Sequence, residues 1–290
     1  MSEARHRVDS ECMALLADQV AHLDTNDGAL ELLYQPEVDL ATGAIVAMEG
    51  LLRWHTQDLG VLAPPAFFAA AESAGQMPAI GEWVLRAGAA EAAAWQSLRG
   101  PARQLRLNVT TSQLLDPRFS DLVSAVVAEH HLPVGALGLE VSEDSLQVLG
   151  DDAPAVLTEL RATGVALAVD DTTFFATLAV IEHLPVDVVK LGTRHVRGVD
   201  LSDDASMAAT VISRAHDRGL VVVAEGVETW GEAVRLLELG CDRAHGWLYA
   251  SAQRGDKARW LLEQGRGWRG AVVSPGVQAA QFVPSPRAAV

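Results

Sequence analysis

The chain has 290 residues, of which 49% are hydrophobic, and this is enough to form one large core. Its formal net charge of −16 argues against a nucleic-acid polymer as partner, although a small anionic ligand stays open because a bound metal ion reverses the local charge. Cys12 and Cys241 provide no disulfide framework, and the sequence shows no signal-peptide core and no apolar run of membrane-spanning length. We therefore expect a cytoplasmic protein with no membrane partner.

The first predicted elements are a helix and a pair of strands. Apolar residues at near-helical spacing predict a helix over about residues 10–23, with Ser10 as its N-cap. A turn signal at residues 26–28 precedes a strand predicted over residues 29–34, which Gln35-Pro36 is expected to end. The short connection into the next strand predicts that the first two strands pair antiparallel.

The rest of the chain alternates short apolar runs with helical segments, which predicts a parallel α/β architecture. Helices are predicted over residues 66–73, 80–95, 121–130, 153–163, 176–183, 205–218 and 231–239, before a last strand over 241–245. Residues 265–290 are rich in Pro, Gly, Ala and Val without periodicity. We expect residues 1–264 to form a single barrel domain and residues 265–290 to be a disordered tail.

Six of the apolar runs end in a polar side chain that can bind a metal ion or an anion. These side chains are Glu49, Asn108, Glu140, the pair Asp170 and Asp171, Lys190, and Glu225. In a closed parallel β/α barrel the ends of these strands meet on one rim. Adjacent carboxylates repel each other unless a cation lies between them, and oxygen ligands without cysteine or paired histidine suit Mg²⁺, Mn²⁺ or Ca²⁺. The pattern predicts a barrel with a hard-cation site, although single acids of this kind also serve as helix N-caps, and Lys190 with Glu225 also fits a buried ion pair.

Several motifs occur in a specific order along the chain. They are Tyr34-Gln35-Pro36, Glu49-Gly50-Leu51-Leu52-Arg53, Asn108-Val109-Thr110, Glu140-Val141-Ser142-Glu143, Asp170-Asp171, Asp187-Val188-Val189-Lys190 and Glu225-Gly226-Val227-Glu228. With this set the chain resembles, over roughly residues 10–262, the EAL domain, a family of cyclic di-GMP phosphodiesterases. The resemblance implies a modified TIM-like (β/α)8 barrel with an antiparallel first strand.

The resemblance also implies a two-metal site that hydrolyses cyclic di-GMP to pGpG, with Mg²⁺ or Mn²⁺ as cofactor and Ca²⁺ either as an inhibitor or as a substitute. One metal would be held by Glu49, Asn108, Glu140 and Asp170, and the second by Asp170, Asp171 and Glu225. The catalytic residues implied are Lys190, Glu225 and Glu49. The substrate-binding residues implied are Gln35, Arg53, Leu52 and His245, with Glu143 and Glu228 supporting the site.

The chain departs from the family pattern at several places, including Trp247 and Ala252, and four of these departures concern the site. The signature Glu-Ala-Leu reads Glu49-Gly50-Leu51, and the Gly-rich loop after the paired aspartates is replaced by residues 172–177, which contain no glycine. Gly192 stands where the family has an aspartate, and His245 replaces a glutamine, either as a ligand or as a packed histidine.

These departures weaken the organisation of the second metal and leave two functions open. One is a weak phosphodiesterase. The other is a catalytically inactive receptor or interaction module, acting as a homodimer or through a signalling protein partner.

Overall fold

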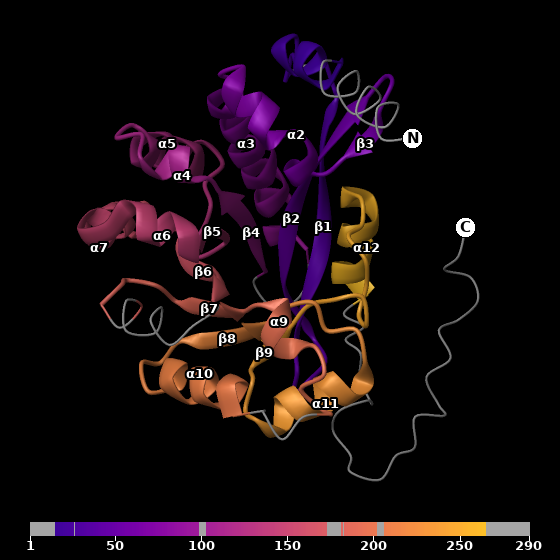
Figure 1. Cartoon of the computed structure of the whole chain (residues 1–290), viewed down its shortest axis with the longest axis vertical. Coiled ribbons are helices and arrows are strands. Elements are labelled where there is room, and N and C mark those ends of the chain that lie inside the picture. The colour runs from indigo at the N-terminus through magenta and orange to yellow at the C-terminus, as the bar shows by residue number, and fades with distance from the viewer. Residues whose placement is uncertain are drawn as a thin grey trace, which may run out of the picture.

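The computed structural model of the protein describes residues 15–25, 27–98, 103–172, 181, 183–201 and 206–264. Eight strands close into a barrel in the order β1–β9–β8–β7–β6–β5–β4–β2, with β1 also paired to β2 (Figure 1). The strands are β1 (Leu30–Asp39), β2 (Ile45–Thr56), β4 (Gln104–Val109), β5 (Leu137–Ser142), β6 (Ala166–Thr172), β7 (Val188–Leu191), β8 (Val221–Ala224) and β9 (Arg243–Ala244). A short strand, β3 (Gly60–Leu62), pairs with β2 outside the closed ring.

The first strand runs against its neighbours, as the short connection predicted. β1 pairs antiparallel with both β2 and β9, whereas the neighbours from β2 to β9 pair parallel. The prediction that Gln35-Pro36 ends this strand was wrong. The amide of Tyr34 points away from β2 to the Gln253 carbonyl at 2.7 Å, and the ring nitrogen of Pro36, two residues on, faces the same side. The position of the missing N–H of Pro36 is therefore on the side away from β2, so no bond to β2 is lost. On that side β9 pairs only with the last two residues of β1, so no bond to β9 is lost either.

Helices surround the outside of the barrel (Figure 1). They are α2 (Pro64–Ser73), α3 (Met77–Gln96), α4 (Thr111–Leu114), α5 (Phe119–Glu129), α6 (Glu143–Leu149), a 3-10 turn η1 (Gly150–Asp152), α7 (Ala153–Ala162), α9 (Thr193–Val196), α10 (Ser206–His216), α11 (Trp230–Glu238) and α12 (Gly255–Gln264). Six of the predicted helices correspond to α2, α3, α5, α7, α10 and α11. The prediction missed α4, α6 and α9, which are too short to show a helical period, and also α12.

Four predictions fall wholly or partly outside the described residues. They concern the start of the amino-terminal helix, the glycine-free loop after Thr172, most of the segment 176–183, and the tail 265–290. Helical structure is described for residues 15–21. Among the described helices, none combines the length and apolar character that a bilayer crossing requires.

Gly50 has a packing role between the barrel and its outer helices. A Cβ at this position would lie 2.7 Å from Leu107 Cδ2, and a Cβ at Gly88 in α3 would lie 2.5 Å from Leu107 Cδ1. The Leu107 side chain thus fills the space of two missing methyl groups between β2, β4 and α3. We infer that the glycine in the signature motif accompanies a large residue at 107.

We therefore expect Gly50→Ala to destabilise the fold by about 1–3 kcal/mol, because overpacking outweighs the smaller backbone entropy gain of alanine. Adding Leu107→Val should recover most of this loss by removing the clashing methyl group. Urea unfolding of the two single variants and the double variant measures the coupling. Strictly additive changes in the free energy of unfolding would contradict the packing explanation.

Candidate active site

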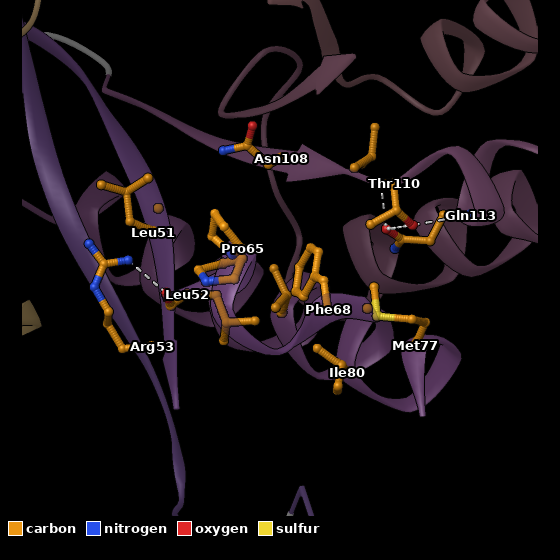
Figure 2. A pocket seen from close by; sticks show the side chains of 15 residues that line it. Leu51, Leu52, Arg53, Pro65, Phe68, Met77, Ile80, Asn108, Thr110 and Gln113 are labelled. Atoms are coloured by element: carbon orange, nitrogen blue, oxygen red, sulfur yellow. Dashed lines mark hydrogen bonds between the residues drawn. The ribbon is translucent and has the colours of Figure 1, made fainter. Parts of the chain in front are cut away.

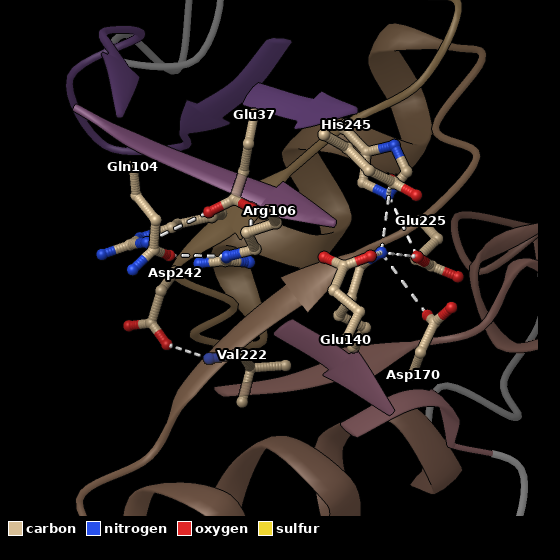
Figure 3. Close-up of polar contacts among 12 residues, drawn as sticks. Glu37, Gln104, Arg106, Glu140, Asp170, Val222, Glu225, Asp242 and His245 are labelled. Carbon is tan, nitrogen blue, oxygen red and sulfur yellow. Dashed lines mark hydrogen bonds and ion pairs between the residues drawn. The ribbon is translucent and has the colours of Figure 1, made fainter. Parts of the chain in front are cut away.

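The strand ends bring four carboxylates around one buried lysine. Lys190 lies in β7 and is 1% exposed, and its Nζ is 2.7 Å from Glu225 Oε1 and 2.8 Å from Glu140 Oε2. Glu49 Oε2 and Asp170 Oδ1 lie slightly farther from Nζ, at 3.3 and 3.4 Å. Figure 3 shows the carboxylates of Glu140, Asp170 and Glu225 turned toward the same point. Five of the side chains singled out from the sequence thus share one place, which we call the Lys190 cluster.

Asn108 reaches the Lys190 cluster through Glu49. The Asn108 amide Nδ2 donates a hydrogen bond of 2.9 Å to Glu49 Oε1, which leaves Glu49 Oε2 facing Lys190. The parallel register explains this approach, because Asn108 lies beside Glu140 across β4 and β5, and β2 is the other neighbour of β4. Asn108 therefore belongs to the same rim as the four acids.

The Lys190 cluster contains four acids around one lysine, and their burial and mutual charges shift the pKa values of these groups. Burial raises the pKa of Glu140 well above its ordinary value and nearby Glu49 adds to this, although Lys190 opposes both. Burial also raises the pKa of Asp170, to about 6. Burial works against the ammonium of Lys190, but the surrounding carboxylates hold its pKa well above the ordinary value. A divalent cation bound here would stabilise the carboxylate forms and so act against these raised pKa values.

His245 follows β9 and is buried against the same cluster. Its Nε2 lies 3.1 Å from Glu225 Oε1 and 3.7 Å from Glu49 Oε2. Burial disfavours the imidazolium, but the hydrogen bond with Glu225 raises the pKa of His245. Burial favours the neutral form of Glu225 and Glu49, yet Lys190 and His245 outweigh it and lower the pKa of both acids. His245 therefore faces charged groups rather than an apolar core.

The paired aspartates lie at an irregularity of β6. The register between β6 and β7 shifts here, and Asp171 has a φ of 49°, a left-handed conformation that aspartate tolerates better than most residues. Asp170 faces the Lys190 cluster, whereas Asp171 is exposed and lies beside Gly192. A Cβ at 192 would be 2.3 Å from Asp171 Oδ1, so Asp171 fills the space where the resemblance places another aspartate.

The oxygen-rich donor set fits a hard divalent cation. Glu140 Oε1 is buried, and within the described part of the chain it has no hydrogen-bond partner. An unpaired carboxylate oxygen in the interior is costly, and a cation among Glu49, Asp170 and Glu225 would remove that cost. Carboxylate and amide oxygens are ligands that Mg²⁺ and Mn²⁺ accept.

A cavity of about 340 Å³ adjoins the rim between β2, β4, α2 and α3 (Figure 2). Leu52, Arg53 and Asn108 line it together with apolar residues that include Phe68 and Ile80. Arg53 Nη1 donates a hydrogen bond of 2.7 Å to the Leu52 carbonyl, which leaves its other guanidinium nitrogens for other contacts. The volume lies within the range of about 300–1,000 Å³ of ligand pockets. Two predicted substrate residues thus share a cavity with a predicted metal ligand.

Three predicted residues make other contacts. Gln35 lies on the rim strand β1, and its Nε2 donates a hydrogen bond of 3.0 Å to the Ala250 carbonyl. Glu228 forms an ion pair with Arg197. Glu143 is the first residue of α6, directly after β5. The assigned roles of these residues stay predictions.

Sequence reasoning missed three charged residues one layer below the rim. Arg106 and Arg243 both face Glu37. Glu37 Oε2 accepts a hydrogen bond of 2.6 Å from Arg106 (Figure 3), and Glu37 Oε1 accepts one of 3.0 Å from Arg243. A Cβ at Gly138 would lie 3.1 Å from Arg106 Cγ, so this glycine leaves room for the arginine. The sequence did carry a signal for the two arginines. Side chains in a strand alternate between its two faces, and Arg106 and Arg243 each lie two positions before a rim residue, so each shares a face with that residue.

Comparison with known proteins agrees with this architecture. The family model described as the EAL domain matches residues 19–252. An uncharacterized Mycobacterium tuberculosis protein is 36% identical over 241 residues, which cover 82% of this chain and 39% of that protein. A Pseudomonas aeruginosa protein named as a cyclic di-GMP phosphodiesterase is 32% identical over 246 residues, which cover 84% of this chain and 42% of that protein.

Among solved structures, the PaMucR phosphodiesterase in complex with c-di-GMP is 28% identical with a TM-score of 0.75, covering 79% of this chain and 94% of that chain. The matched region is thus nearly the whole of that solved chain, but less than half the length of the two sequence relatives. The modified barrel with an antiparallel first strand predicted from the sequence is confirmed.

Proposed function

Because the chain belongs to the EAL domain family, we propose that it is a metal-dependent phosphodiesterase that hydrolyses cyclic di-GMP to linear pGpG. The observation that carries this proposal is the convergence of Glu49, Glu140, Asp170 and Glu225 on Lys190. Acids from separate strands seldom converge at a barrel rim unless they serve a common function, such as binding a ligand or a metal ion. A phosphodiester is anionic, so such a negative site needs cations before it can accept one.

In this proposal Glu49, Asn108, Glu140 and Asp170 hold one ion, and Asp170, Asp171 and Glu225 hold the second. When bound, Mg²⁺ or Mn²⁺ would stabilise charge on the phosphate and provide hydroxide near neutral pH, whereas Ca²⁺ would substitute poorly. Glu140 Oε1, which is buried and has no hydrogen-bond partner among the residues that the structure describes, supports the first ion, and the approach of Asp170 to Glu225 supports the second. The second ion also requires Asp171 to turn from Gly192 toward the rim.

The protein side chains then bind the ligand and handle its protons. Lys190, held as an ammonium by its carboxylate neighbours, donates hydrogen bonds to the attacking water or to the phosphate once metal binding frees it from them. Arg53 binds the second phosphate bidentately, which its planar guanidinium favours. The cavity beside Leu52 receives a guanine base between apolar side chains. Gln35 and His245 contact the ligand or its waters from the β1 and β9 side of the rim.

A second candidate function is a receptor that binds cyclic di-GMP without cleaving it. The position of Asp171 beside Gly192 favours this alternative, because it takes a proposed ligand of the second metal away from the rim, and residue 192 has no carboxylate to help organise that metal. A first ion alone would still support phosphate binding, and the signal would pass to a second copy of the chain or to another signalling protein.

The deciding experiment incubates the purified full chain with cyclic di-GMP and either Mg²⁺ or Mn²⁺, and separates the products by chromatography. We expect pGpG to form with metal and to disappear when a chelator is added. Ligand binding without pGpG would establish the receptor function in place of the enzyme. If the chain neither binds nor cleaves the dinucleotide, both candidate functions are wrong.

A further inference from the structure

His245 brings a nitrogen ligand to a rim that is otherwise built from oxygen ligands. Its Nε2, one carboxylate oxygen of Glu49 and one of Glu225 all lie within 4.8 Å of one another. His245 is 9% exposed, and its Nδ1 is buried with no hydrogen-bond partner among the described residues. Of the two ring nitrogens, it is thus Nε2 that contacts the Lys190 cluster.

The backbone around His245 fixes this orientation. The His245 amide donates a hydrogen bond of 2.9 Å to the Ala224 carbonyl, and its own carbonyl accepts one of 3.1 Å from the Val227 amide. At the next residue, a Cβ on Gly246 would lie 2.2 Å from the Val227 carbonyl oxygen, so only glycine allows this close approach. His245 and Glu225 therefore leave adjacent strand ends side by side, with their functional atoms in contact.

Two roles are compatible with this geometry. A protonated His245 would act as a permanent positive partner for Glu225, like a second Lys190. A neutral His245 would present the Nε2 lone pair between two carboxylates, which is the arrangement of a mixed nitrogen and oxygen metal site. The ligand atoms lie close enough for one ion to reach Nε2 and a carboxylate together, and such an ion would displace a proton from the imidazole.

We propose that His245 joins Glu225 as a ligand of the second ion, with Glu49 within reach of the same place, and that this chain therefore binds Mn²⁺ or a similar transition-metal ion in preference to Mg²⁺. The inference rests on the metal site of the proposed function, but it does not depend on hydrolysis. Imidazole adds affinity for first-row transition metals, whereas Mg²⁺ retains its preference for oxygen ligands. An amide side chain at this position, as in the family pattern, would provide no such selectivity.

The test uses the full chain stripped of metal with a chelator, without any nucleotide. Calorimetric titration of Mn²⁺ and of Mg²⁺ is compared for the unchanged protein, His245→Gln and the control His55→Gln, a partly exposed histidine that pairs with Glu31. We expect His245→Gln to weaken Mn²⁺ binding about tenfold or more while Mg²⁺ binding changes less than about twofold. His55→Gln should change neither affinity.

A pulsed electron paramagnetic resonance measurement makes the inference independent of whether the variant folds. The unchanged protein with bound Mn²⁺ should show hyperfine coupling to an imidazole nitrogen, and ¹⁵N-labelled histidine should shift that coupling. Absence of nitrogen coupling, or equal losses for Mn²⁺ and Mg²⁺ in His245→Gln, would overturn the proposal. Nitrogen coupling in a protein that forms no pGpG would support His245 as a ligand and reject only the phosphodiesterase.

Discussion

Glu49→Gln is expected to reduce the turnover of cyclic di-GMP by about a thousandfold or more. Glu49 contributes one oxygen to Asn108 and the other to Lys190, and it is one of the two carboxylates near His245. Glutamine keeps the volume and the bond to the Asn108 amide but removes the negative charge that would hold a cation. Loss of metal stabilisation costs several kcal/mol in the transition state, and each 1.36 kcal/mol is a factor of about ten in rate.

The measurement is the initial rate of pGpG formation at saturating Mn²⁺, with the metal affinity determined separately. Glu82→Gln is the matched control, because Glu82 forms an exposed ion pair with Arg86 on α3, away from the rim. This control should leave turnover unchanged. If Glu49→Gln retained the rate of the unchanged protein, the site would have been assigned to the wrong residues.

The barrel and its rim could be predicted because strand ends carry a local signal. An apolar run that stops at an acid, an amide or a lysine is visible without any tertiary information, and the topology of a parallel barrel then places all such ends together. For Glu140, Asp170, Lys190 and Glu225 this reasoning led to side chains that lie in contact. The antiparallel first strand was predicted from the short connection for a similar, local reason.

Other features depend on contacts that the local pattern does not contain. Pro36 continues β1 because its missing N–H faces a side where no strand pairs, and this depends on where β9 begins. Asp171 follows Asp170 directly, yet the irregularity of β6 turns it toward Gly192. Adjacent residues in a strand point to opposite faces, so the pair was never equivalent. His245 was found as a departure from a family pattern, but only the structure shows which nitrogen faces the acids.

The charged layer below the rim links the fold to the site. Arg106 Nη2 is buried and, like Glu140 Oε1, has no hydrogen-bond partner in the described part of the chain. Arg106 also lowers the pKa of Glu140, in opposition to burial, so its positive charge stabilises a carboxylate at the rim. A rim crowded with carboxylates is thus balanced from below by Arg106 and from within by Lys190, which limits the repulsion that the metal-free protein must tolerate.

Lys190→Met should separate metal binding from turnover. Lys190 is one of two lysines in the chain, and the other, Lys257, lies over the ring of Trp260 on α12 and provides the control Lys257→Met. Without the ammonium, the four acids lose a cation that occupies the same space as a metal ion, so we expect the affinity for Mn²⁺ to rise about tenfold. The metal-free variant should lose about 3 kcal/mol of unfolding free energy, and Mn²⁺ should restore most of it.

Turnover should nevertheless fall by about 10²–10⁴-fold in Lys190→Met, because the group proposed to position the water or the phosphate is gone. Calorimetry, urea unfolding with and without Mn²⁺, and the rate of pGpG formation together test this split. Tighter metal binding with an unchanged rate would mean that Lys190 only neutralises the acids. Weaker metal binding would mean that Lys190 orders the carboxylates for the cation, rather than taking its place.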